Sequence, residues 1–551
     1  MAQIDKLCAD AIRVLSAEAV QKAKSGHPGM PMGAADMAYA LWATQMKHNP
    51  KDPKWINRDR FVLSSGHGSM LEYSLLHLCG YGLTMDDIKQ FRQWGSLTPG
   101  HPEYGHTVGV ETTTGPLGQG IANAVGFAIA EAHLAAKFNR PGYPVIDHYT
   151  YCILGDGCMM EGISGEACSL AGTLKLNKLI ALYDDNEISI EGDTNIAFRE
   201  DVPARYRAYG WNVIDVRDGN CWKQVSDAIE LAKHSDKPTL IVCHTAIGFG
   251  SPKAGMASAH GEPLGPDNLA ATKEALGWPC KEPFTVPAEV YEHIAELMKK
   301  NEQAEADWQK LFSDYREAYP DLAGAWDFWF SEELPLDLMN DKDLWAFEGK
   351  EATRASSGTV LNKLAARIPN LFGGSADLAP SNKSYTKGRG DFSAEDRSGC
   401  NMHYGVREHA MSAISNGIAL HGGLRPYCAT FFVFSDYMKN GMRMSALMKL
   451  PVTYILTHDS IGVGEDGPTH QPVEHLAGLR AMPGLNVFRP ADSREVAAGW
   501  ILSQTTHAPT ALVLTRQNLP LYEHSGADAL KGGYIISDCE GTPDVLLMAS
   551  G

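Results

Sequence analysis

The chain has 551 residues, of which 44% are hydrophobic and 21% are charged, so it is ordinary globular protein and too long for one hydrophobic core. Its formal charge of -18 argues against a duplex nucleic acid or an anionic membrane as a partner, because both would be repelled over most of the surface. We therefore expect at least two domains, and any anionic ligand must meet a local basic pocket.

The N-terminal segment contains acidic residues and no unbroken apolar run, so it resembles neither a signal peptide nor a transit peptide. Nowhere do 18 apolar residues follow one another, as a membrane span would require. The eleven cysteines include no CxxC pair, which is typical of reduced thiols packed as small hydrophobic groups. These features predict a cytoplasmic protein.

The first half of the chain alternates apolar runs of strand length with longer stretches that could form crossover helices. This alternation predicts an α/β fold with a parallel sheet. The predicted strands are HYTYCIL, LNKLIALY, WNVIDV and TLIVCHT.

Two of these strands end in polar residues that could bind a metal ion. Asp156 lies between two glycines after HYTYCIL, and Asn186 follows LNKLIALY. Carboxyl ends of neighbouring parallel strands meet at one edge of the sheet, where α/β proteins bind ligands. A carboxylate, an amide oxygen and a backbone carbonyl of Ile188 would suit Mg²⁺ or Ca²⁺, with positions left for a diphosphate. A GDG sequence alone could equally be a tight turn, but its combination with Asn186 favours a metal site.

A glycine-rich stretch, GPLGQG at residues 115–120, precedes the helical run IANAVGFAIAEAHLAAKF. Free amides and the positive end of the helix dipole could hold a diphosphate there. Because no strand directly precedes it, a dinucleotide fingerprint or close helix packing is an open alternative.

Residues 279–350 are charged and helix-forming, and they are predicted to link a first domain at 1–278 to a second at 351–551. The second domain is again predicted to be α/β, with strands in NLFGG, YCATFFVF, VTYILTH, LNVFRP and TALVLTR and a helix in VREHAMSAISNGIAL. The chain stops at DVLLMASG, a buried-strand pattern with nothing after it to pack against.

The pair formed by GDG and an asparagine about thirty residues later resembles the thiamine diphosphate motif. Around it, SGHPGMPMG, GSADLAPSN, YGVREH, GEDGPTHQPVEH and LTRQN occur in the order seen in transketolases, so the chain resembles that family over nearly its whole length, without the family's third, C-terminal domain. The resemblance implies two consecutive thiamine-binding α/β domains. It also implies a homodimer whose active sites lie between subunits.

By this resemblance, Glu408 activates the cofactor through a hydrogen bond to its aminopyrimidine ring, and burial would favour the protonated acid. The cofactor's own imino group then generates the ylid. Without the resemblance, Glu408 could be a solvated acid in the first turn of a helix. The resemblance implies cofactor contacts for His67, Gly115, Leu117, Gly157, Asn186, Ile247, Glu408 and Phe434. It implies metal contacts for Asp156, Asn186 and Ile188. It also implies an aromatic pocket formed by Phe431, Phe434 and Tyr437.

The resemblance also implies a sugar phosphate site. Glycine-flanked histidines could exchange protons with sugar hydroxyls, and none has the short spacing of a zinc site. Arginines and a hydroxyl could hold a phosphate, although each arginine alone could be a surface residue. The implied catalytic residues are Glu408, His27, His260 and His470. Substrate contacts are implied for His27, His101, His260, Arg354, Ser381, His458, Asp466, His470 and Arg516.

Glu161 and Glu166 resemble acids that link the two cofactor sites of the dimer, or they are surface charges. The expected reaction moves a two-carbon ketol unit from xylulose 5-phosphate to ribose 5-phosphate or erythrose 4-phosphate, in the pentose phosphate pathway. Deoxyxylulose-phosphate synthase, dihydroxyacetone synthase and a cofactor-binding module without turnover are the alternatives.

Overall fold

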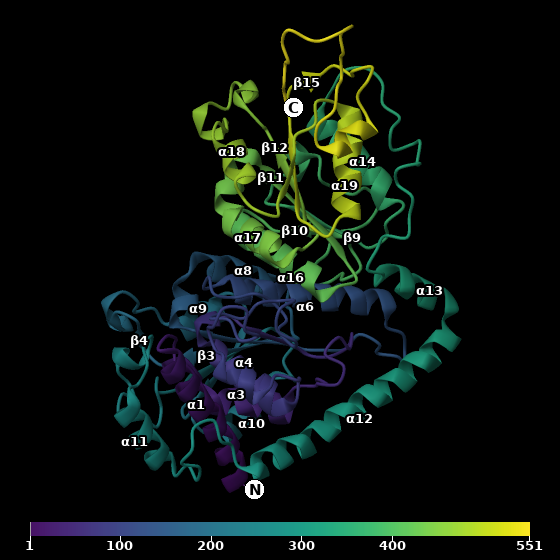
Figure 1. The fold of residues 1–551 in the computed structure, drawn as a ribbon. Helices are drawn as coiled ribbons and strands as arrows, with labels where there is room; N and C mark the ends of the chain where they lie inside the picture. Colours follow the sequence, from purple (N-terminus) through teal and green to yellow (C-terminus); the bar gives the residue numbers. More distant parts are fainter. Residues whose placement is uncertain (1) are drawn as a thin grey trace. The chain divides into compact units, whose positions relative to one another are not determined.

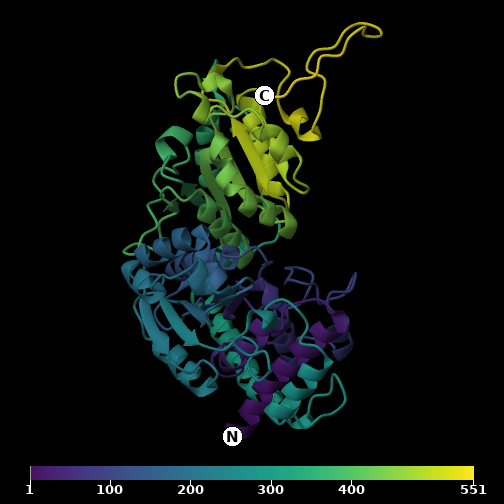
Figure 2. The ribbon, with the colours of Figure 1, turned by 90° about the vertical axis from the view of Figure 1, so that its left-hand side faces the viewer.

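The computed structural model describes residues 2–551, which form two compact units that meet in the chain between Ala318 and Tyr319 (Figure 1). Each unit contains a parallel sheet with helices on both faces, as Figure 1 and the turned view in Figure 2 show. The predicted α/β fold is therefore confirmed. No helix among the described residues is both long and apolar enough to cross a membrane.

The sheet of the first unit has the strand order β1-β2-β3-β7-β6, and all its neighbours are parallel. Leucine, isoleucine and valine dominate its central strands, as expected when both faces of a sheet are covered. The bounds are β1 (Arg60–Leu63), β2 (Thr150–Gly155), β3 (Leu179–Asp185), β6 (Asn212–Val216) and β7 (Thr239–His244). Of these, β1 was not predicted from the sequence.

Helices cover the two faces of this sheet. Alternate strand residues such as Phe61, Ile153 and Leu182 face a core shared with α1, α3, α4 and α10, while α6 and α8 pack together on the sheet's other face. The main helices are α1 (Ala2–Ala23), α3 (Ala35–Tyr39), α4 (Ser69–Cys79), α6 (Gln119–Phe138), α8 (Gly162–Thr173), α10 (Trp222–Ala232), α11 (Pro266–Leu276) and α12 (Ala288–Ala318). Shorter elements are α2 (Gly29–Gly33), α5 (Met85–Lys89), α7 (Asp156–Met160), α9 (Val202–Ala208), β4 (Ile188–Ser189) and β5 (Gly192–Asp193).

The charged helical stretch predicted as a linker forms α12 and, after it, α13 (Pro320–Trp329). Helix α12 packs on the first unit, because Val290, Ile294 and Met298 lie in that unit's core. The proposed division at residues 278 and 350 stays a prediction.

The second unit holds a sheet of order β10-β9-β11-β12-β14-β13, also parallel throughout. Helices α14 and α19 contribute residues such as Val360 and Trp500 to the core on one face, and α16 packs on α17 (Figure 1). The strands are β8 (Glu351–Ala352), β9 (Leu371–Ser375), β10 (Asn401–His403), β11 (Arg425–Phe431), β12 (Thr453–Thr457), β13 (Asn486–Phe488), β14 (Thr510–Leu514) and β15 (Asn518–Leu519). The helices are α14 (Thr353–Ala365), α15 (Ala379–Asn382), α16 (Glu408–His421), α17 (Ser435–Met448), α18 (His475–Arg480) and α19 (Ser493–Thr505).

Three details of the predicted strands differ in the structure. The strand within YCATFFVF ends at Phe431, and Phe432–Phe434 turn into a short 3₁₀ helix that leads into α17. The strand in LNVFRP is only half-buried because it lies at the edge of the sheet. The predicted strand in DVLLMASG does not form: Leu547 is 94% exposed, because none of the described strands pairs with this segment, and an extended segment needs such a partner.

Candidate active site

Asp156 is the first residue of α7, directly after β2, and its side chain is buried. The Tyr183 hydroxyl donates a hydrogen bond to Oδ1, whereas Oδ2 is buried with no hydrogen-bond partner. Burial, reinforced by the nearby carboxylates of Asp184 and Asp185, raises the pKa of Asp156 to about 7. A buried carboxylate oxygen without a donor is costly, and a cation is the group that would satisfy it. The site therefore fits a divalent metal ion.

Asn186 follows β3, the strand next to β2, as predicted. Its amide nitrogen donates to Asp184 Oδ2 at 2.9 Å, and its Oδ1 accepts from the backbone N–H of Ile188 at 3.0 Å. The intervening residue, Glu187, has a left-handed backbone with φ of 58°. This tight turn brings Asn186 and Ile188 together beside the acidic end of the sheet. Oxygen donors of this kind suit Mg²⁺ or Ca²⁺.

The glycine-rich stretch lies against this edge of the sheet. A Cβ placed on Gly157 would stand 2.7 Å from Leu117 Cδ1, and one on Gly66 would stand 2.6 Å from the backbone nitrogen of Gly115. These close approaches place Gly115 beside the loop that carries His67, and Leu117 beside the turn that carries Asp156. Ile247, another implied contact, is buried just after β7.

Three histidines that are far apart in the sequence meet in the first unit. The ring centroids of His27 and His67 are 5.1 Å apart, those of His27 and His260 are 5.7 Å apart, and His67 stacks on His260 at 5.1 Å. His101 is close enough to His27 and His67 to affect the pKa of both. His27, His67 and His260 are each partly buried.

Burial sets the charge state of this cluster. Burial lowers the pKa of His27 to about 4, with help from the Arg92 guanidinium and neighbouring histidines, and the pKa of His67 to about 3, with help from neighbouring histidines. It also lowers the pKa values of His101 and His260. At neutral pH the rings are therefore uncharged, and each offers one N–H donor and one acceptor nitrogen. Burial therefore makes these imidazoles weaker bases than ordinary histidines.

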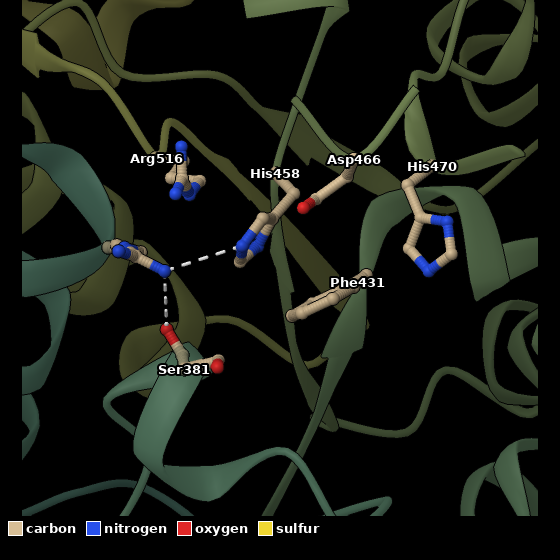
Figure 3. A pocket seen from close by; sticks show the side chains of 7 residues that line it. Ser381, Phe431, His458, Asp466, His470 and Arg516 are labelled. Atoms are coloured by element: carbon tan, nitrogen blue, oxygen red, sulfur yellow. Dashed lines mark hydrogen bonds between the residues drawn. The ribbon is translucent and has the colours of Figure 1, made fainter. Parts of the chain in front are cut away.

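The second unit contains a pocket of about 430 Å³ in which most of the predicted substrate residues come together (Figure 3). The residues come from the start of α14, from α15, from the ends of β11, β12 and β14, and from the loop after β12. The lining residues are Arg354, Ser381, Phe431, His458, Asp466, His470 and Arg516.

Arg354 is the best-fixed cation of this pocket. Its Nη1 donates to the backbone oxygen of Ser381 at 3.1 Å and lies 3.3 Å from His458 Nε2, while its Nε is buried without a partner. Arg516 donates to the Val463 carbonyl at 3.3 Å and pairs with Glu465 at 2.5 Å. The unpaired Nε and the two guanidinium groups fit an anion, which answers the need for a local basic pocket.

Glu408 is buried as the first residue of α16, and Oε1 accepts a hydrogen bond from the Thr430 hydroxyl at 3.1 Å. The predicted aromatic residues form a continuous group: Phe431 stacks on Phe434 at 6.1 Å, and Phe434 contacts Tyr437 at 6.1 Å. His470 packs edge-on against Phe434 at 5.3 Å. These residues run from a strand end through a 3₁₀ turn into α17.

Glu161 is the N-cap of α8 and is exposed, and Glu166 lies within the same helix.

The sequence did not indicate two further residues that contact predicted site residues. These are Arg92, whose Nη2 is 3.4 Å from His27 Nδ1, and Tyr183, whose hydroxyl donates a hydrogen bond to Asp156. Neither lies in a distinctive motif, so only the fold could identify them.

Two family models together match most of the chain. Residues 4–335 match the family model described as "Transketolase, thiamine diphosphate binding domain", and residues 350–521 match "Transketolase, pyrimidine binding domain". The chain is 56% identical to a transketolase from Bacillus subtilis over 560 residues, which cover 100% of this chain and 84% of that protein. It is 54% identical to a transketolase from Halalkalibacterium halodurans, covering 100% of this chain and 83% of that protein.

The chain belongs to the transketolase family. Solved structures agree: a transketolase from Leishmania mexicana superimposes with a TM-score of 0.96 at 47% identity, covering 98% of this chain and 81% of that one. A Pichia stipitis transketolase in complex with sedoheptulose 7-phosphate gives a TM-score of 0.95 at 48% identity, with the same coverage. The predicted resemblance is confirmed, and the chain is an enzyme of the transketolase family with thiamine diphosphate as its cofactor. The roles of individual residues stay predictions.

Proposed function

We propose that this enzyme transfers a two-carbon ketol unit from a ketose phosphate, such as xylulose 5-phosphate, to an aldose phosphate, such as ribose 5-phosphate or erythrose 4-phosphate. The observation that carries the proposal is the pocket around Arg354, where an unpaired guanidinium nitrogen and a second arginine face one cavity. This arrangement supports recognition of a terminal phosphate by an otherwise acidic protein. The reported complex of a relative with sedoheptulose 7-phosphate supports the same class of substrate.

The diphosphate of the cofactor and its metal ion would bind to the first unit. Asp156 and Asn186, with the Ile188 carbonyl, would hold a Mg²⁺ ion that binds the diphosphate, and Ca²⁺ could replace it. The glycine-rich stretch at 115–120 would cradle the diphosphate, because its glycines allow close backbone approach. When bound, thiamine diphosphate supplies the carbanion chemistry that breaks and forms the C–C bond.

The protein's own groups would position the reactants and handle protons. Glu408, buried at the start of α16, would form a hydrogen bond to the aminopyrimidine. The neutral imidazoles of His27 and His260 would accept or share protons at sugar hydroxyls. Arg354 and Arg516 would hold the phosphate, so that the sugar enters in one orientation.

The assembly and location are also proposals. A homodimer with active sites between subunits follows from the family, and the proposed cofactor residues are divided between the two units. A cytoplasmic location in the pentose phosphate pathway is supported by the eleven free cysteines, nearly all buried or half-buried.

The experiment is a coupled assay of the purified chain with thiamine diphosphate and Mg²⁺. Xylulose 5-phosphate and ribose 5-phosphate should yield a three-carbon aldose phosphate and a seven-carbon ketose phosphate. Release of carbon dioxide from pyruvate would instead indicate a deoxyxylulose-phosphate synthase, and a preference for formaldehyde as acceptor would indicate a dihydroxyacetone synthase. Binding of the cofactor without any product would contradict ketol transfer by this chain.

A further inference from the structure

We propose that Glu474 and His475 bind a divalent transition-metal ion on the second unit, with Asp436 holding the His475 imidazole in place, apart from the metal site proposed at Asp156. One possible ligand atom from each of the three side chains lies within 4.8 Å of the other two. They form the one such group of three or more metal-ligating side chains in the described part of the chain.

The three residues come from two helices. Asp436 lies in the first turn of α17, Glu474 is the N-cap of α18, and His475 is the first residue of α18. The His475 Nε2 lies 3.0 Å from Asp436 Oδ2, and its ring packs against Phe432 with a centroid distance of 5.7 Å. The imidazole is thus fixed in place by packing and by a carboxylate.

The second ring nitrogen of His475 has no hydrogen-bond partner although it is buried. The side chain is only 6% exposed, and the nearest anionic atom to Nδ1 is Glu474 Oε2, at 3.8 Å. A buried nitrogen without a partner is costly, and a cation between it and the carboxylate would satisfy it. Histidine ligands commonly donate their other N–H to a carboxylate, which is the role Asp436 can take here.

The two carboxylates give the site its charge and its route to solvent. Their side chains are 59% and 80% exposed, so an ion can enter from solution. In the described part of the chain, His475 is the only ion-pair partner of either acid. Two negative charges therefore remain available to match a divalent cation.

The ligand set indicates which metals would bind. One imidazole and one carboxylate, with a second carboxylate behind the imidazole, suit Zn²⁺, Co²⁺ or Ni²⁺, whereas Mg²⁺ prefers sites built from oxygen alone. An ion held here would join the start of α17 to the start of α18. The segment before α18 carries His470, which lines the pocket of the second unit, so the ion would anchor one end of that segment.

The test uses the full chain saturated with thiamine diphosphate and excess Mg²⁺, so that the Asp156 site is occupied. Isothermal calorimetry with Zn²⁺ should show one binding event per chain, and Zn²⁺ should raise the melting temperature. His475→Gln should weaken Zn²⁺ binding at least tenfold and abolish the rise in melting temperature. Glu474→Gln should also weaken binding, and it should leave folding intact because this side chain is exposed.

A matched control comes from another histidine of the same unit. His403 Nε2 lies 2.9 Å from Asp391 Oδ1, which makes a similar histidine–aspartate pair without a third ligand. His403→Gln should leave Zn²⁺ binding unchanged. The proposal is overturned if the unaltered chain does not bind Zn²⁺, or if His475→Gln binds it as tightly as the unaltered chain does.

Discussion

The Arg354 guanidinium and the His458 imidazole lie side by side, with Nη1 of the arginine 3.3 Å from Nε2 of the histidine. Burial and this cation together lower the pKa of His458 to about 4, so the ring is neutral at pH 7. An N–H of Arg354 can then point at the lone pair of Nε2, while Nδ1 faces the Thr457 hydroxyl at 2.9 Å. The pair holds Arg354 in place without neutralising its charge.

Replacing Arg354 with alanine should therefore weaken recognition of phosphorylated sugars. Hydrogen bonds to charged groups contribute about 1.5–3 kcal/mol, so the KM for xylulose 5-phosphate should rise roughly 10- to 100-fold. Steady-state kinetics with an unphosphorylated ketose should show a much smaller change. Arg494→Ala is the matched control, because Arg494 lies outside the pocket and donates to the Tyr522 carbonyl. Equal losses for both kinds of donor would contradict a phosphate-binding role.

Glu408→Gln should bind thiamine diphosphate nearly as well as the unaltered chain but should lose most of its turnover. An amide keeps the size of the buried side chain and can still accept from Thr430, yet it lacks the acid's proton. The expected loss is about 10²- to 10⁴-fold, as for removal of a general acid or base. Calorimetry would measure cofactor binding, and deuterium exchange at C2 of the bound cofactor would measure its activation.

The exposed Glu523 provides the control for Glu408. Glu523→Gln should change neither measurement. Unchanged C2 exchange in Glu408→Gln would show that Glu408 does not activate the cofactor.

The histidine cluster should make the protein less stable in acid. His67 has a folded pKa of about 3, below its ordinary value of about 6.5, so the unfolded chain binds the extra proton between these pH values. Stability from the neutral ring is complete above pH 6.5 and is lost as the pH falls toward 3. His67→Gln should lower the slope of unfolding free energy against pH by up to about 1.4 kcal/mol per pH unit near pH 5.

Urea unfolding at pH 7, 6 and 5 would measure this slope. The exposed His507 gives the control, and His507→Gln should leave the slope close to that of the unaltered chain. A slope for His67→Gln equal to that of the unaltered chain would mean that His67 titrates normally in the folded state.

Gly29→Ala should disturb the histidine cluster directly. A Cβ at this position would lie 2.4 Å from the backbone oxygen of Ala259, which precedes His260, while Gly29 itself follows His27 by two residues. The clash involves backbone that cannot rotate away, so we expect a loss of about 1–3 kcal/mol of stability together with lower activity.

Gly324→Ala in α13 is the control for this substitution, because nothing lies within 4 Å of its Cβ position. It should be neutral or should stabilise by about 0.4–1 kcal/mol. Denaturation curves would compare the two variants, and equal stabilities would refute the close approach at Gly29.

Much of the fold could be predicted because hydrophobic patterns are local. The runs ending before Asp156 and Asn186 became β2 and β3, and their parallel pairing put both residues at one edge of the sheet. The strand predicted in YCATFFVF is too long, because Phe432 begins a 3₁₀ helix and an apolar run does not show where a strand ends. The half-buried strand β13 lies at the edge of its sheet, a position that the pattern in LNVFRP does not indicate because strand order depends on pairings between distant segments.

The sequence by itself determined the α/β class, the family and the residues that carry its motifs, Asp156 and Glu408 among them. Only the tertiary structure decided how these residues meet and what charge they carry. His27, His67 and His260 pack together because three separate segments converge, and burial, with help from the neighbouring histidines, lowers the pKa of His67 to about 3. The periodicity of hydrophobic residues along the chain indicates helices and strands. The distances between side chains from separate segments are set by long-range packing, and the electrostatic free energies that shift pKa values depend on those distances.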